Sequence, residues 1–279
     1  MTRPIPAWPQ GWTPQRRFGE GRVAYACDEH GVAVLGIDAP ERMNALDALA
    51  LAGLVAALET AEAEARVVVL TGLGGRAFIS GADLSGFEGP AGGGASQATH
   101  GGPTFLEGQQ RLAACPLPLV AAIRGYCLGG GLTMAMSCDF RLASADASFG
   151  VPAAKLGLAF GAEGLARLVE AIGPGRTRRL LFVGDRVDAP AALAWGLVEE
   201  VHAPDALWPA AMALARQIAG NAPLSIRATK ATVADLLAAP EARDPEAVAA
   251  LARACRDSAD VAEGRAAFRE KRAPRFAGR

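Results

Sequence analysis

The chain has 279 residues, of which 51% are hydrophobic, and its formal net charge is −1. That length is enough to bury one large core or two unequal ones. The balanced charge argues against nucleic acid or an anionic membrane as a partner, and no apolar run reaches the roughly 18 residues that a membrane-spanning helix needs.

The first half of the chain alternates short apolar runs with glycine-rich turns and helical stretches. Residues 1–19 contain proline and tryptophan without a continuous apolar run, so we expect an N-terminal arm rather than a signal peptide. Strands are predicted at residues 23–27, 32–37, 67–71, 119–123 and 139–143, and helices at residues 46–64, 105–114 and 132–137. The glycine-rich segment Gly86–Gly102 is expected to be mobile. This alternation predicts an α/β core whose strand ends deliver loops to one site.

The second half of the chain is dominated by alanine, leucine and arginine. Helices are predicted at residues 163–171, 176–182, 189–195, 205–219, 223–237, 243–256 and 259–270, with one short strand at residues 197–201. We therefore predict an α/β core over residues 20–203 and a helical oligomerisation region over residues 204–279. The apolar faces of such helices need a partner, and packing between subunits would supply it.

The cysteines and histidines predict neither a disulfide framework nor a metal site. The five cysteines are irregularly spaced and include no Cys-x-x-Cys pair, which is typical of buried thiols in a reducing cytoplasm. The three histidines show no spacing that suggests metal ligation. We expect a cytoplasmic protein with no metal and no tightly bound cofactor.

Two glycine-rich turns, Phe78–Leu84 and Gly125–Thr133, each follow a predicted strand. Glycine and alanine leave a backbone N–H sterically open. Two such donors that converge on one point form an oxyanion hole, which stabilises the negative charge developing on a thioester carbonyl. Each turn taken alone is also consistent with a strand-to-helix connection that merely needs small residues. A phosphate-binding P-loop is excluded, because no Lys-Ser or Lys-Thr pair follows Gly131.

Together with four further segments in the same order, these turns resemble the enoyl-CoA hydratase/isomerase (crotonase) superfamily. The further segments are Pro40–Leu46, Ala147–Pro152, Gly184–Val198 and Glu263–Phe276, so the resemblance covers residues 20–276. It implies a crotonase-like spiral of β-β-α units with a C-terminal helical trimerisation region, and a homotrimer or a hexamer built as a dimer of trimers. It also implies an acyl-CoA or enoyl-CoA substrate, with coenzyme A as part of the thioester.

The resemblance also implies roles for individual residues. Motif matching assigns the oxyanion hole to the N–H groups of Ala82 and Gly130. The positions matched to coenzyme A binding are Arg42, Met43, Ser80, Phe268 and Lys271. In the family, the residues at the positions of Phe268 and Lys271 often act across a subunit boundary. Without the resemblance, the charge of Arg42 would be that of a solvated loop, and the charge of Lys271 that of a solvated tail.

The acid and base of the family's hydratases are missing from the matching positions. Their two glutamates correspond here to Thr133 and Ala153, and neither of these acts as a base near neutral pH. The best remaining acid is Glu163, two residues beyond the position where dienoyl-CoA isomerases of the family carry an aspartate. The alternative is that Glu163 only stands in the first turn of the next helix, stabilised by the helix dipole. His100 and Glu107 are weaker candidates.

Three hypotheses follow. The first is an acyl-CoA-metabolising enzyme that polarises the thioester at Ala82 and Gly130, forms an enolate and uses Glu163 for proton transfer; conventional hydration is disfavoured. The second is a non-catalytic acyl-CoA-binding protein that keeps the fold and the oxyanion hole. The third is an acyl-CoA hydrolase or dehalogenase on the same fold, for which the sequence places no carboxylate or histidine clearly.

Overall fold

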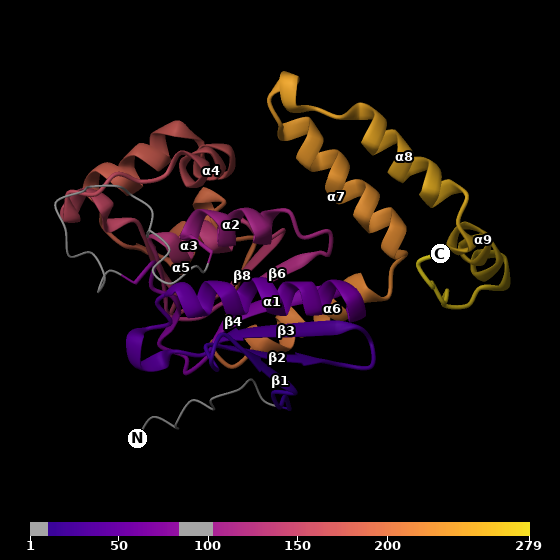
Figure 1. Cartoon of the computed structure of the whole chain (residues 1–279), viewed down its shortest axis with the longest axis horizontal. Helices are drawn as coiled ribbons and strands as arrows, with labels where there is room; N and C mark the ends of the chain where they lie inside the picture. The colour runs from indigo at the N-terminus through magenta and orange to yellow at the C-terminus, as the bar shows by residue number, and fades with distance from the viewer. Residues whose placement is uncertain (1–10, 84–102) are drawn as a thin grey trace.

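Two sheets built from repeating β-β-α units make up the body of the protein in the computed structural model, which describes residues 11–83 and 103–279 (Figure 1). The larger sheet has the strand order β1 (Arg16–Phe18), β2 (Val23–Cys27), β3 (Val32–Ile37), β4 (Val67–Gly72), β6 (Leu119–Ile123), β8 (Phe140–Ser144) and β11 (Glu200–His202). The smaller sheet has the order β10 (Val187–Asp188), β9 (Ser148–Gly150), β7 (Tyr126–Leu128) and β5 (Ala77–Ile79).

Three successive units place one strand in each sheet before a helix follows, whereas β2 and β3 both lie in the larger sheet. β4, β5 and α2 (Phe105–Ala113) form one unit, and β6, β7 and α3 (Gly130–Met136) form the next. In the unit after that, β8 and β9 are followed by the short helix η2 (Pro152–Leu156) and by α4 (Ala162–Val183). β5, β7 and β9 run parallel, so the turns that follow them meet at one edge of the smaller sheet. The predicted spiral of β-β-α units is confirmed.

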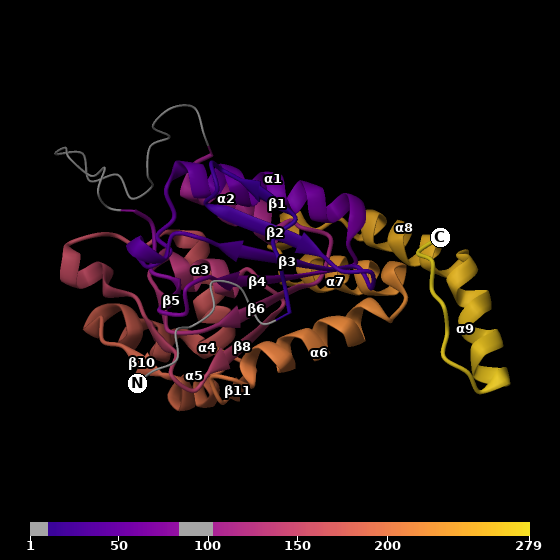
Figure 2. The same ribbon diagram turned by 90° about the horizontal axis from the view of Figure 1, so that it is seen from below.

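Helices cover both faces of the larger sheet. α1 (Ala48–Glu64) and α2 lie over one face and α6 (Leu207–Ala219) over the other (Figure 2). Val68 and Leu70 of β4 pack into the core on the α1 side, whereas Val67 and Val69 pack with α6. Successive side chains of a strand point to opposite faces, so a strand that is apolar throughout needs a covering layer on each side.

The N-terminal segment is attached to the body over its described part. β1 pairs antiparallel with β2, and Trp12 packs edge-on against Trp208 of α6 with ring centroids 6.2 Å apart. Arg16–Phe18, which lie within the N-terminal arm predicted over residues 1–19, form a strand. The adjacent arginines Arg16 and Arg17 gave no apolar signal for this strand. The segment Gly86–Gly102 lies outside the described residues, and so does His100.

The C-terminal helices α7 (Pro223–Leu237), α8 (Pro245–Arg256) and α9 (Ala259–Glu270) project from the body (Figures 1 and 2). The boundary predicted near residue 203 would assign α6 to this region, but α6 packs on the larger sheet. The projecting part therefore begins at α7. Lys230 ties α7 to the body, because its Nζ donates to the Leu117 carbonyl and to Asp139, both at 2.7 Å.

The remaining elements follow the predicted helical segments closely. α5 (Ala189–Trp195) lies next to β11, and the short helices η1 (Pro40–Arg42) and η3 (Pro240–Ala242) lie in connections. α4 is interrupted at Gly173 (φ 75°, ψ 165°) directly before Pro174, in the gap between the two helices predicted there. Over the described ranges, the structure contains no helix that is both long and apolar enough to cross a membrane.

Candidate functional site

Three turns meet at one edge of the smaller sheet and surround a cavity of about 240 Å³. β5 leads into Ser80–Ala82, β7 leads into Gly129 and Gly130, and β9 leads into Val151–Ala153. Helix α2 and the first turn of α4 complete the walls. Most of the lining is apolar, and its larger side chains are Phe105, Leu106, Val151, Leu156, Leu158 and Phe160.

The backbone nitrogens of Ala82 and Gly130 lie close together at the wall of the cavity. A methyl group added at Gly130 would lie 3.3 Å from the Ala82 nitrogen. Ala82 forms a parallel bridge with Leu46 in which the Gly81 carbonyl and the Asp83 N–H make the hydrogen bonds, so the Ala82 N–H points away from Leu46. Gly130 begins α3, where an N–H has no intrahelical acceptor. Within the described part of the chain neither N–H has an acceptor, so both remain available as hydrogen-bond donors.

Glycine is needed where the two turns come together. Gly129 has φ 51° and ψ −119°, in a region that residues with side chains rarely adopt. A methyl group added at Gly131 would lie 1.9 Å from the carbonyl oxygen of Ile79, so the first turn of α3 rests directly on the end of β5. A larger residue would strain the backbone at Gly129 and would push α3 away from β5 at Gly131.

Asn44 fixes the loop that leads into α1. Its side chain is fully buried; Oδ1 accepts from the Ala39 N–H at 3.0 Å, and Nδ2 donates to the carbonyls of Leu73 at 2.9 Å and Ala77 at 2.7 Å. Asn44 has φ 56°, a left-handed conformation in which asparagine is enriched. These bonds tie the loop to β5 and thereby support the turn that carries Ala82. Sequence reasoning used Asn44 only as part of a motif and missed this role.

Thr133 and Ala153 both line the cavity. The Thr133 hydroxyl donates to the Gly130 carbonyl at 2.7 Å, so its proton is used within α3. A methyl group added at Gly164 would lie 2.5 Å from Cγ2 of Thr133, which places the threonine methyl against α4. Neither side chain brings a group to the cavity that titrates near neutral pH.

Glu163 lines the cavity from the first turn of α4. Among the described residues of the lining it is the one carboxylate, and it stands in the first helical turn as the alternative interpretation required. Glu107 has a different role. Its carboxylate accepts from the N–H of Thr104 at 2.6 Å and from the Thr104 hydroxyl at 2.9 Å, which caps α2 and lowers the pKa of Glu107.

Three of the five residues matched to coenzyme A lie near the cavity. Ser80 lines it, and the Ser80 N–H donates to the Met43 carbonyl at 3.2 Å. Arg42 directly precedes Met43, and its Nη1 lies 3.0 Å from Asp47 while its Nη2 contacts Asp83. A phosphate at Arg42 would therefore compete with two carboxylates.

The other two matched residues do not join the cavity within one chain. Phe268 is 87% exposed on α9, and Lys271 ends that helix in a left-handed conformation. α9 lies at the opposite end of the molecule from α3 and α4 (Figures 1 and 2).

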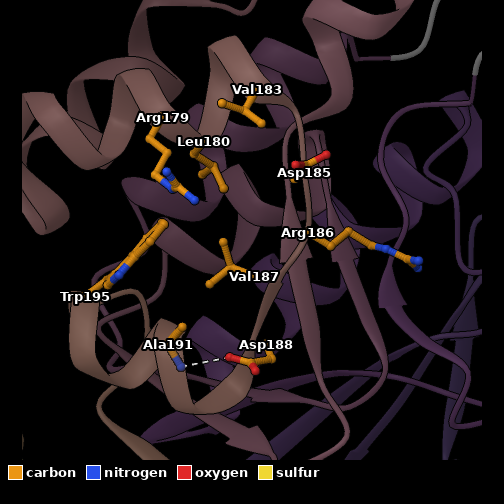
Figure 3. Close-up of a pocket in the computed structure, with 9 residues that line it drawn as sticks. All are labelled: Arg179, Leu180, Val183, Asp185, Arg186, Val187, Asp188, Ala191 and Trp195. Carbon is orange, nitrogen blue, oxygen red and sulfur yellow. Dashed lines mark hydrogen bonds between the residues drawn. The ribbon is translucent and has the colours of Figure 1, made fainter.

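A second hollow, of about 320 Å³, lies between α4, β10 and α5 (Figure 3). Asp188 caps α5 through a hydrogen bond to a backbone N–H, and Asp185 pairs with Lys155 at 2.6 Å. Arg186 points away from the hollow, over the ring of Tyr126 at 5.2 Å. Both carboxylates are thus held in structural contacts. Over residues 11–83 and 103–279 no group of histidine, cysteine and acidic side chains could hold a metal ion.

Comparisons with known proteins agree with one another. A family model described as Enoyl-CoA hydratase/isomerase matches residues 28–279. The crotonyl-CoA hydratase of Syntrophomonas wolfei is 33% identical over 89% of this chain and 95% of its own length. The (E)-benzylidenesuccinyl-CoA hydratase of Thauera aromatica is 36% identical over 88% and 96%, respectively. The crystal structure of an enoyl-CoA hydratase/carnithine racemase from Magnetospirillum magneticum has a TM-score of 0.82 and 35% identity, covering 92% of this chain and 96% of that one.

Proposed function

The chain belongs to the enoyl-CoA hydratase/isomerase family, whose members act on CoA thioesters, and we propose that it binds the thioester carbonyl oxygen between the N–H groups of Ala82 and Gly130. The observation that carries this proposal is that these two N–H groups lie close together at an apolar cavity and have no acceptor among the described residues. Each such donor is worth about 2.7–4 kcal/mol once negative charge develops on the oxygen.

The proposed reaction begins at the α-carbon of the acyl group. The Glu163 carboxylate takes an α-proton, the C–H electron pair forms a double bond to the carbonyl carbon, and the carbonyl oxygen takes the negative charge. The two N–H groups then stabilise the enolate. Return of the proton to the α-carbon gives isotope exchange. In a 3-enoyl thioester, return of the proton to the γ-carbon moves the double bond into conjugation.

We propose this route because the cavity lacks the acids of a conventional hydratase. Thr133 and Ala153 stand at the positions matched to the two family glutamates, and the Thr133 hydroxyl is already bonded within its own helix. Glu163 is the remaining carboxylate of the described lining. The acid/base chemistry would therefore be non-standard for the family.

Coenzyme A would approach past Ser80 and Met43, with its phosphates displacing a carboxylate from Arg42. Phe268 and Lys271 would complete the site from a neighbouring subunit. The large apolar side chains exposed on the projecting helices support such an assembly; they are Val233, Leu236, Leu237 and Phe268. We propose a homotrimer or a hexamer. The five free cysteines are in keeping with the predicted cytoplasmic location.

The second candidate is a non-catalytic acyl-CoA-binding protein. It is favoured by Thr133 and Ala153, because neither side chain can act as an acid or base at the positions matched to the two family glutamates. It would use the same two N–H groups and differ only in lacking turnover. An acyl-CoA hydrolase or dehalogenase has less support, because no histidine is among the described residues of the cavity lining.

The test of the enzymatic proposal is Glu163→Gln, with Glu170→Gln as its matched control. Glu170 is exposed on the same helix and outside the cavity lining. Glu163→Gln is expected to lower turnover about 10²–10⁴-fold, because general acid–base catalysis contributes that much. Acyl-CoA dissociation constants should change less than about twofold, since an exposed hydrogen bond contributes little. Unchanged turnover would remove Glu163 from the mechanism, and tight binding without turnover in the wild type would favour the second candidate.

A further inference from the structure

Gln109 is a buried amide that has no hydrogen-bond partner in the described part of the chain. It lies on α2, is 5% exposed and lines the cavity. Its polar atoms are not sealed off as the orphaned Ser144 hydroxyl is, so they remain open to the cavity. Asn44 is the contrasting case, because that buried amide makes three hydrogen bonds to backbone groups.

Gln109 lines the cavity about one helical turn along α2 from the contact between Phe105 and Gly130. Phe105 closes over Gly130, with its ring 2.5 Å from the place of an added methyl group. Gln109 follows Phe105 by four residues and lies on the same face of α2, about 6 Å further along the helix axis. Gly108 packs against Leu51 and Met134, whereas the next residue, Gln109, lines the cavity.

Folding alone does not explain an amide at this place. The surrounding lining is apolar, and a leucine of similar size would fill the same volume without unpaired polar atoms. A buried polar group without a partner destabilises the folded state. A ligand that supplies the missing partner does explain the residue, because the amide offers two N–H donors and one acceptor.

We infer that Gln109 hydrogen-bonds an oxygen on the acyl chain, and that the substrate is a CoA thioester whose acyl group carries a hydroxyl or oxo group beyond the α-carbon. This inference rests on the proposed function, since it places the thioester carbonyl at Ala82 and Gly130. A hydroxyl can both accept from and donate to the amide, whereas an oxo group only accepts. Gln109 is thus a specificity residue, and Glu163 and the two N–H groups carry the chemistry.

The test compares dissociation constants of matched CoA thioesters by calorimetry. Each pair has the same acyl length, and one member carries a hydroxyl or oxo group at C3, C4 or C5. The wild type is expected to bind one oxygenated thioester about fivefold or more tightly than its saturated parent, as one added hydrogen bond allows. Gln109→Leu and Gln109→Met should abolish the preference and leave the parent's binding unchanged or tighter. Gln110→Leu, an exposed position on the same helix, should keep it.

Thermal unfolding is a second measurement, because a purely structural role of Gln109 would lower the melting temperature of its variants. Gln109→Leu should melt at the wild-type temperature or above, because no group inside the protein loses a partner. A lower melting temperature in both apolar variants, no preference in the wild type, or a preference that persists in the variants would each overturn the inference. If the saturated thioesters bind but no oxygenated thioester binds more tightly than its saturated parent, only this inference fails. If no thioester binds at all, the proposed function fails and takes the inference with it.

Discussion

Substitution of Gly130 by alanine tests the oxyanion hole without changing a polar group. Gly130 is within a helix, so its backbone accepts alanine. The added methyl group would lie 3.3 Å from the Ala82 nitrogen and 2.5 Å from the tip of the Phe105 ring. It would therefore occupy the space that the carbonyl oxygen needs, and it would also push against a ring that can turn aside.

The two effects differ in size and can be separated. Overpacking against Phe105 lowers the free energy of unfolding by about 1–3 kcal/mol. Keeping the carbonyl oxygen away from one oxyanion donor raises the activation free energy by about 2.7–4 kcal/mol, so kcat/KM is expected to fall about 10²–10³-fold. The double variant with Phe105→Leu should recover the stability but not the activity. Steady-state kinetics, measured well below the melting temperature, separates the two effects.

Gly161→Ala is the matched control for Gly130→Ala. Gly161 lines the same cavity, has φ −64°, and an added methyl group there would have no atom within 4 Å. Its turnover should stay within about twofold of the wild type, since surface substitutions of this kind change energies little. The assignment of the oxyanion hole is refuted if folded Gly130→Ala keeps wild-type turnover, or if Phe105→Leu restores its activity.

Three further predictions concern stability and assembly. Asn44→Ala should lower the free energy of unfolding in urea by about 3 kcal/mol, because three buried backbone partners lose their bonds; a loss below about 1 kcal/mol would contradict this. Burial raises the pKa of the Cys115 thiol from 9.0 to about 11 and that of Cys138 to about 12. The folded chain keeps protons that the unfolded chain loses, so stability should fall as pH rises above 9, by up to about 1.4 kcal/mol per pH unit for each thiol. Cys115→Ala should remove its share of that slope in urea titrations at pH 8–10, and an unchanged slope would exclude it. Sedimentation should give the mass of three or six chains, and a single-chain mass would contradict the proposed assembly.

Local sequence patterns were sufficient for the helices and the central strands. The bounds predicted for α5, α7 and α9 match those observed, because their alanine and leucine spacing decides the conformation locally. The two helices predicted at residues 163–171 and 176–182 likewise leave a gap where α4 is interrupted, at Gly173. These features depend on residues a few positions apart, and a single sequence contains that information.

The smaller sheet could not be predicted from local patterns. β5, β7 and β9 have three residues each, so neither length nor alternation marks them as strands. Their pairing is what brings the two glycine-rich turns together. Gln109 was missed as well, although it shares a helix face with Phe105 and Leu112; a lone polar residue on an otherwise apolar face was the available signal.

The most direct test of the central proposal is mass spectrometry of saturated, 2-enoyl and 3-enoyl CoA thioesters incubated with the protein in D2O. We predict deuterium at the α-carbon, or a moved double bond, in at least one thioester, and a loss of that change in Glu163→Gln. Thioesters that bind tightly yet stay unlabelled and unchanged would contradict an enolate-forming enzyme and leave an acyl-CoA-binding protein.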